Sequence, residues 1–122
     1  MANKKILIID DDPDILDMTK IILNANGFET ITALDGNLGL ESFKKENPDL
    51  VLCDMMMETV DAGVVVAGKI RQENKTVPII LLSSIGDATS FEIDTAALGF
   101  TGVFQKPFEP GNLILTIKKA LG

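Results

Sequence analysis

Short runs of apolar residues divide this chain, and each run stops abruptly at polar residues. The first run covers residues 6–9, consists of isoleucine and leucine, and ends in three consecutive aspartates, Asp10, Asp11 and Asp12. Runs this short predict strands that are buried on both faces, as in a parallel sheet covered by helices. Three later strands of the same kind are expected at 49–53, 78–82 and 102–105, and they lead into Asp54, Ser83 and Lys106.

The segments between these strands are predominantly of helical character. Apolar residues recur at helical spacing in four of them, at 13–26, 36–46, 91–98 and 113–121. Residues 28–33 are rich in β-formers and predict an outer strand. Residues 64–71 contain three valines and a glycine, which are poor helix formers, but a connection of this length between parallel strands needs a crossover helix. The chain therefore predicts β-α repeated five times, an α/β fold with five parallel strands and five helices.

Length, charge and cysteine usage restrict the class of protein. The 122 residues fit one domain, residues 1–122, and the net charge of −7 argues against binding of a nucleic-acid backbone. No apolar run approaches the ~20 residues that a membrane span requires, and the apolar run behind the basic start is too short for a signal peptide. The single cysteine cannot form an internal disulfide, which fits a reducing cytoplasm.

The polar residues at the strand ends predict one shared site. Carboxyl ends of parallel strands lie side by side, so Asp10, Asp11, Asp54, Ser83 and Lys106 are expected to converge. Like charges at about 4 Å cost roughly 4 kcal/mol at an effective dielectric of ~20, and a hard divalent cation such as Mg²⁺ would offset this cost. A carboxylate beside such a cation, with a hydroxyl and an ammonium group opposite, suits the acceptance of a phosphoryl group.

These five positions, in this order and approximate spacing, resemble the receiver domain of bacterial two-component response regulators. The resemblance covers the whole chain and implies a flavodoxin-like, doubly wound sheet of order 2-1-3-4-5, with the first and last helices on one face. It implies that Asp54 accepts the phosphoryl group, that Ser83 then hydrogen-bonds it, and that Lys106 pairs with its charge. The Mg²⁺ ligands that it implies are Asp10, Asp11, Asp54 and the backbone carbonyl of Met56.

The resemblance also implies a role in signalling. A histidine kinase or phosphotransfer protein would supply the phosphoryl group, and the phosphorylated domain would present an altered surface to a downstream protein or to a detached output domain. The chain would act in the cytoplasm as a monomer or as a phosphorylation-linked dimer. It would be a self-dephosphorylating switch and not a turnover enzyme.

Two departures from the family pattern affect the expected behaviour. The family usually carries an aromatic residue three positions before the lysine, where this chain has Val103, and Phe104 is expected to point to the opposite face of the strand. The positions two beyond the acceptor and two beyond the hydroxyl residue influence self-hydrolysis in the family. Here they are Met56 and Ile85, which cannot orient a water, so we expect a long-lived phospho-aspartate.

Other interpretations of the acidic residues remain open at this point. A phosphorylation-independent, receiver-like binding module would need no acceptor, and Val103 favours it. A haloacid-dehalogenase-type phosphatase would use an Asp-x-Asp pair such as Asp10 and Asp12, but Lys106 stands in the wrong order for it and the chain leaves no room for a cap domain. An EF-hand is excluded because Ile15 and Ile21 occupy the positions of its required glycine and glutamate.

Overall fold

The computed structural model describes residues 3–54, 62–84, 100–106 and 109–122. Within these residues, strands and helices alternate along most of the chain. In order they are β1 (Lys5–Ile9), α1 (Pro13–Ala25), β2 (Glu29–Ala33), α2 (Gly36–Glu46), β3 (Leu50–Asp54), α3 (Ala62–Glu73), β4 (Ile79–Ser84), β5 (Gly102–Lys106) and α4 (Pro110–Leu121).

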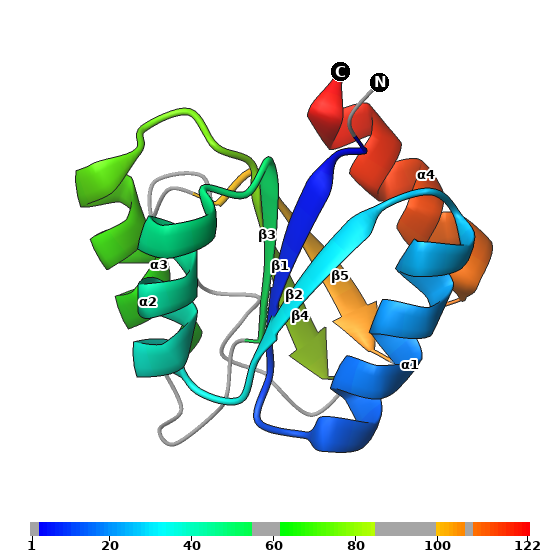
Figure 1. Cartoon of the computed structure of the whole chain (residues 1–122), viewed down its shortest axis with the longest axis horizontal. Helices are drawn as coiled ribbons and strands as arrows, with labels where there is room; N and C mark the ends of the chain where they lie inside the picture. Colours follow the sequence, from blue (N-terminus) through cyan, green and yellow to red (C-terminus); the bar gives the residue numbers. More distant parts are fainter. Residues whose placement is uncertain (1–2, 55–61, 85–99, 107–108) are drawn as a thin grey trace.

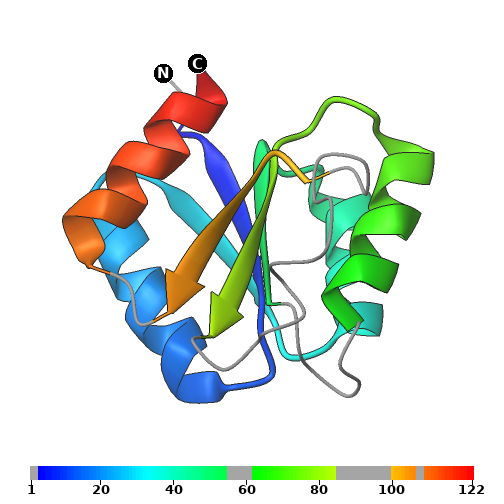
Figure 2. The same cartoon turned by 180° about the vertical axis from the view of Figure 1, so that it is seen from behind.

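The five strands form one parallel sheet in the order β2-β1-β3-β4-β5, which confirms the predicted topology. Helices α1 and α4 lie on one side of the sheet, and α2 and α3 lie on the other (Figures 1 and 2). Helix α4 is the last of the five predicted helices. The helix predicted at 91–98 lies outside the described residues, and the other four are found in the expected segments, although α4 begins earlier than predicted.

Each face of the sheet carries its own hydrophobic core, and β1 contributes to both. Leu7 and Ile9 belong to the core beneath α2 and α3, whereas Ile6 and Ile8 belong to the core beneath α1 and α4. All four side chains are completely buried, as predicted for a strand covered on both faces. The polar residues of this segment therefore begin only after β1, at its carboxyl end, with Asp10.

Capping side chains fix where helices α1 and α4 begin. The Asp12 carboxylate accepts a hydrogen bond of 2.9 Å from the backbone N–H of Asp14 and begins α1 at Pro13. Helix α4 begins at Pro110, three residues before the predicted start, because the Glu109 carboxylate caps it by accepting from the N–H groups of Gly111 and Asn112. Glutamate is not among the preferred capping residues, so this helix start is only weakly indicated by the residue types.

Helix α2 approaches β1 closely at Gly39. A Cβ atom at this position would lie 2.5 Å from Cδ1 and 2.9 Å from Cγ1 of Ile9, whose side chain is completely buried. Ile9 is the residue immediately before Asp10. The missing side chain of Gly39 therefore lets α2 pack against the part of β1 that leads into the acidic turn.

This close approach predicts opposite effects for two glycine substitutions. Gly39→Ala should lower the free energy of unfolding by about 1–3 kcal/mol, because the overpacking against Ile9 outweighs the better helix propensity of alanine. Gly68→Ala, in the exposed part of α3, should raise it by up to about 1 kcal/mol, because a Cβ there meets no atom within 4 Å. Urea denaturation of both variants tests the comparison, and a Gly39→Ala variant as stable as Gly68→Ala would contradict it.

No helix among the described residues has both the length and the apolar character needed to cross a membrane.

Candidate functional site

Three aspartates meet at the carboxyl ends of β1 and β3. One carboxylate oxygen from each of Asp10, Asp11 and Asp54 can be chosen so that all three lie within 4.8 Å of one another. The strand register explains the meeting, because Ile9 pairs with Cys53 and the next residue on each strand is an acid. The structure thus brings together these three predicted site residues, which come from distant parts of the chain.

Asp10 is held in place by the backbone on both sides. Its N–H donates to the carbonyl oxygen of Ala33 at the end of β2 over 3.1 Å, and its Oδ1 accepts from the N–H of Asp12 over 3.0 Å. Its side chain is completely buried, and that of Asp54 is only 4% exposed, whereas Asp11 is exposed to solvent. The contact with Ala33 was not foreseen from the sequence, since it depends on the register of β2 against β1.

The electrostatics of the cluster favour a bound cation. The buried carboxylates of Asp10 and Asp54 at a separation of up to 4.8 Å repel each other by roughly 3–4 kcal/mol at an effective dielectric of about 20. Carboxylate oxygens are the ligands that hard divalent cations prefer, and soft or borderline metals would call for thiolate or imidazole ligands. The acidic cluster could therefore hold a metal ion, and its donor set fits a hard one.

Cys53, which precedes Asp54, takes no part in this chemistry. Its side chain is completely buried in the core beneath α2 and α3, and its Sγ contacts the backbone oxygen of Asp54 at 3.7 Å. Burial, together with the nearby charges of Asp54 and Asp10, raises the pKa of the Cys53 thiol far above its ordinary value. The thiol thus stays protonated at neutral pH, which excludes it as a nucleophile and leaves it the role of a small core residue.

The other predicted site residues belong to the neighbouring strand ends. Asp54 pairs with Leu82, so the backbone of Ser83 lies one residue further along β4 at the same edge of the sheet. Lys106 is the last residue of β5, where its backbone pairs with Ser84. Met56 lies outside the described residues. The strand ends thus lie in the predicted order from Asp10 to Lys106.

The position of Val103 agrees with the prediction for β5. Val103 pairs with Leu81 and its side chain is 45% exposed, whereas Phe104 packs against the core beneath α1 and α4. The two side chains lie on opposite faces of the strand. Val103 is thus a small aliphatic residue at an exposed position where the family described above usually has an aromatic one.

A doubly wound parallel sheet with acids at the carboxyl ends of its first and third strands defines a class of α/β proteins that bind ligands at this edge. Residues 6–118 match the model of the response regulator receiver domain, and the chain belongs to this family of two-component signalling domains.

Curated relatives and solved structures agree with this assignment. The chain is 37% identical over 121 residues to a probable transcriptional regulator, ycf27, of Porphyridium aerugineum, covering 99% of this chain and 49% of that protein. It is 33% identical to the alkaline phosphatase synthesis transcriptional regulatory protein PhoP of Bacillus subtilis, over 98% of this chain and 49% of that protein. The chain thus spans about half the length of these curated relatives.

Among solved structures, a putative response regulator from Chloroflexus aurantiacus superposes with a TM-score of 0.88 at 31% identity, covering 98% of both chains. The receiver domain of NtrX from Brucella abortus superposes with a TM-score of 0.87 at 29% identity, covering 95% of this chain and 97% of that one. Both similarities extend over nearly the whole chain, so the receiver fold accounts for the sheet and the helices on both of its faces.

Proposed function

We propose that this receiver domain is a phospho-acceptor switch that takes a phosphoryl group onto Asp54. The observation that carries the proposal is the position of the Asp54 carboxylate, which lies at the end of β3, only 4% exposed, in a cluster with Asp10 and Asp11. A carboxylate at the ligand-binding edge of such a sheet can act as a nucleophile toward phosphorus. The donor would be a phosphohistidine of a histidine kinase or of a phosphotransfer protein.

In the proposed transfer, a carboxylate oxygen of Asp54 attacks phosphorus, and the bond from phosphorus to the donor imidazole nitrogen breaks as the new phosphorus–oxygen bond forms. The imidazole leaves with the electron pair and takes up a proton. Asp10, Asp11, Asp54 and the carbonyl of Met56 would hold Mg²⁺, whose charge would offset that of the phosphoryl oxygens. Asp10 and Asp11 would in this way place the metal ion beside the acceptor carboxylate of Asp54.

After transfer, two neighbouring strand ends would respond to the new charge. The hydroxyl of Ser83 would donate to a phosphoryl oxygen, and the ammonium group of Lys106 would pair with it. These contacts would shift the surfaces around 85–99 and 102–112 and so change the binding of a partner, a local electrostatic event that biases a two-state element. The domain then acts as a self-dephosphorylating switch and not as a turnover enzyme.

The partners and setting follow from the same proposal. The curated relatives are about twice as long as this chain and carry names of transcriptional regulators, so we propose an output domain or a separate protein as the downstream partner. With a net charge of −7, residues 1–122 would form a single receiver domain that does not itself bind nucleic acid. It would act in the cytoplasm, as a monomer or as a dimer linked to phosphorylation.

The test of this function is incubation with acetyl phosphate, with and without Mg²⁺, followed by intact-mass spectrometry. We expect a metal-dependent gain of one phosphoryl group. The exposed Val103 favours a second candidate, a receiver-like module that binds partners without phosphorylation. A folded protein that gains no phosphoryl group would support that module in place of the switch.

The phosphorylated form is predicted to be long-lived. Met56 and Ile85, both outside the described residues, stand at positions that influence self-hydrolysis in the family, and neither side chain can orient a water for attack. The double variant Met56→Asn/Ile85→Glu should lose its phosphoryl group about tenfold faster or more, since a positioned general base contributes on the order of 10²-fold. Mass spectrometry after removal of the donor gives both decay rates, and equal rates would refute the prediction.

A further inference from the structure

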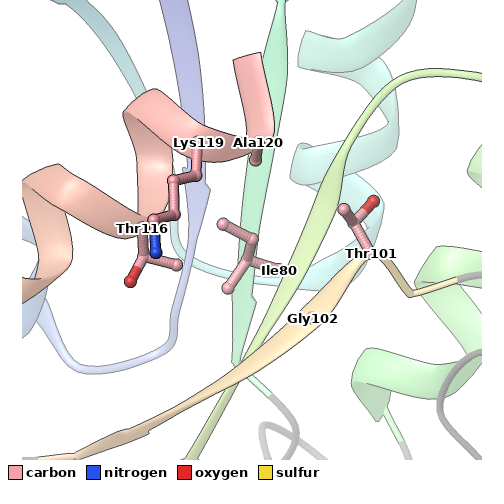
Figure 3. A pocket seen from close by; sticks show the side chains of 6 residues that line it. All are labelled: Ile80, Thr101, Gly102, Thr116, Lys119 and Ala120. Carbon is pink, nitrogen blue, oxygen red and sulfur yellow. The ribbon is translucent and has the colours of Figure 1, made fainter. Parts of the chain in front are cut away.

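A pocket lies at the opposite end of the sheet from the acidic cluster, between the beginnings of β4 and β5 and the last two turns of α4 (Figure 3). It has a volume of about 280 Å³ and is lined by Ile80, Thr101, Gly102, Thr116, Lys119 and Ala120. At about 3.3 Å per strand residue, Ile80 is roughly 10 Å along β4 from Ser83. The pocket is thus separate from the acidic cluster at the carboxyl ends of the strands.

The pocket exists because residue 102 has no side chain. Gly102 pairs with Ile80, a member of the core beneath α1 and α4, so a side chain at 102 would project on that same face. A Cβ atom built there would meet no atom within 4 Å. Ile80, which is only 1% exposed, and Ala120 supply the apolar surface around this space.

The polar groups of the pocket are suited to an anion. Lys119 lines it from α4, and the ion pairs found in the described part of the chain, Lys5 with Glu46 and Lys44 with Glu73, do not involve it. Lys119 is exposed to solvent, so its positive charge can serve an anionic ligand that occupies the pocket.

The two threonines of the pocket retain hydrogen-bonding capacity. The hydroxyl of Thr116 donates to the carbonyl oxygen of Asn112 over 2.8 Å and can still accept. The hydroxyl of Thr101 accepts from the N–H of Ile79 over 3.0 Å, which leaves its own proton to donate. The pocket thus combines an apolar wall, one cation and one hydroxyl donor.

We propose that this pocket binds a small amphiphilic carboxylate, with a short alkyl chain beside Gly102 and its carboxylate at Lys119. The alkyl part would contact Ile80 and Ala120. Ligand pockets usually measure about 300–1,000 Å³ and are mainly apolar with few polar groups, so this pocket, at about 280 Å³, lies just below that range and suits a small ligand. The proposal does not depend on phosphoryl transfer to Asp54.

The test is a titration of the whole ¹⁵N-labelled chain with hexanoate, followed by NMR, with hexan-1-ol as the neutral probe of equal length. Hexanoate should cause saturable shifts of the amides of Gly102, Thr116 and Ala120 at millimolar concentration, and hexan-1-ol should bind about threefold to tenfold more weakly. Lys119→Gln should remove this preference for the carboxylate. Lys118→Gln, a change in the exposed neighbouring lysine that does not line the pocket, should keep it.

The variant Gly102→Val provides an independent test of whether the ligand occupies this pocket. Valine suits a strand and its Cβ meets no obstacle, so the variant should fold while its side chain fills the pocket and abolishes the hexanoate shifts. The proposal would be overturned if the shifts were scattered or did not saturate, or if the wild type bound both probes equally. It would also be overturned if Lys118→Gln and Lys119→Gln lost the preference for hexanoate to the same extent.

Discussion

Asp54→Asn is expected to abolish phosphoryl uptake from acetyl phosphate, lowering its rate by at least ~100-fold. An amide of the same shape lacks the ionised oxygen that attacks phosphorus. Asp54 sits 4% exposed at the end of β3, so a near-isosteric replacement should leave the surrounding strands in place. Intact-mass spectrometry of the variant in the presence of Mg²⁺ measures the loss.

The matched control for this variant is Asp17→Asn. Asp17 is an exposed acid on α1, outside the acidic cluster, and its replacement changes the net charge by the same amount. Phosphoryl uptake should continue at the wild-type rate in this control. Uptake by Asp54→Asn at a comparable rate would contradict the assignment of Asp54 as the acceptor.

Removing one buried charge from the cluster is expected to stabilise the metal-free protein and to weaken its response to Mg²⁺. In Asp10→Asn the Oδ1 atom can still accept from the N–H of Asp12, so the turn is kept while the repulsion with Asp54 disappears. We expect the free energy of unfolding in EDTA to rise by about 1–3 kcal/mol, which is below the full pair repulsion because nearby groups already screen part of it.

Mg²⁺ should stabilise the wild-type protein more than it stabilises Asp10→Asn. A ligand that binds only the folded state at 100 times its dissociation constant adds about 2.7 kcal/mol to wild-type stability, and Asp10→Asn should lose most of this gain. Urea denaturation of wild type, Asp10→Asn and Asp17→Asn, each in EDTA and in Mg²⁺, gives the comparison. If Asp10→Asn were less stable than the wild type in EDTA, the carboxylates would not destabilise the metal-free protein by repulsion. If Mg²⁺ raised the free energy of unfolding equally in all three proteins, the cluster would not be the metal site.

The positions of β1, β3 and β4 were predictable from the sequence because burial on both faces leaves short, uninterrupted apolar runs. Helix α3 was less obvious, since its three valines have low helix propensity. In the structure Val66, Ala67 and Ile70 are buried in the core beneath α2 and α3, so tertiary packing compensates for the weak propensity. The start of α4 was missed by three residues because its cap, Glu109, is an unusual one.

The candidate site was predictable to the extent that it depends on topology. Parallel strands place their carboxyl ends at one edge, and this alone brings Asp10, Asp11 and Asp54 together. The contact of the Asp10 N–H with Ala33 depends on the register of β2 and was not predictable. The pocket at Gly102 was also invisible in the sequence, because a missing side chain creates space only where the facing helix is known.

The most direct test of the central claim is to locate the phosphoryl group in the wild-type chain. The protein would be incubated with acetyl phosphate and Mg²⁺, the acyl phosphate reduced with borohydride so that the modified aspartate becomes homoserine, and the peptides sequenced by mass spectrometry. We predict homoserine at position 54 alone, and only when Mg²⁺ was present. Homoserine at position 10 or 11, or an unmodified chain that is nevertheless folded, would contradict the account.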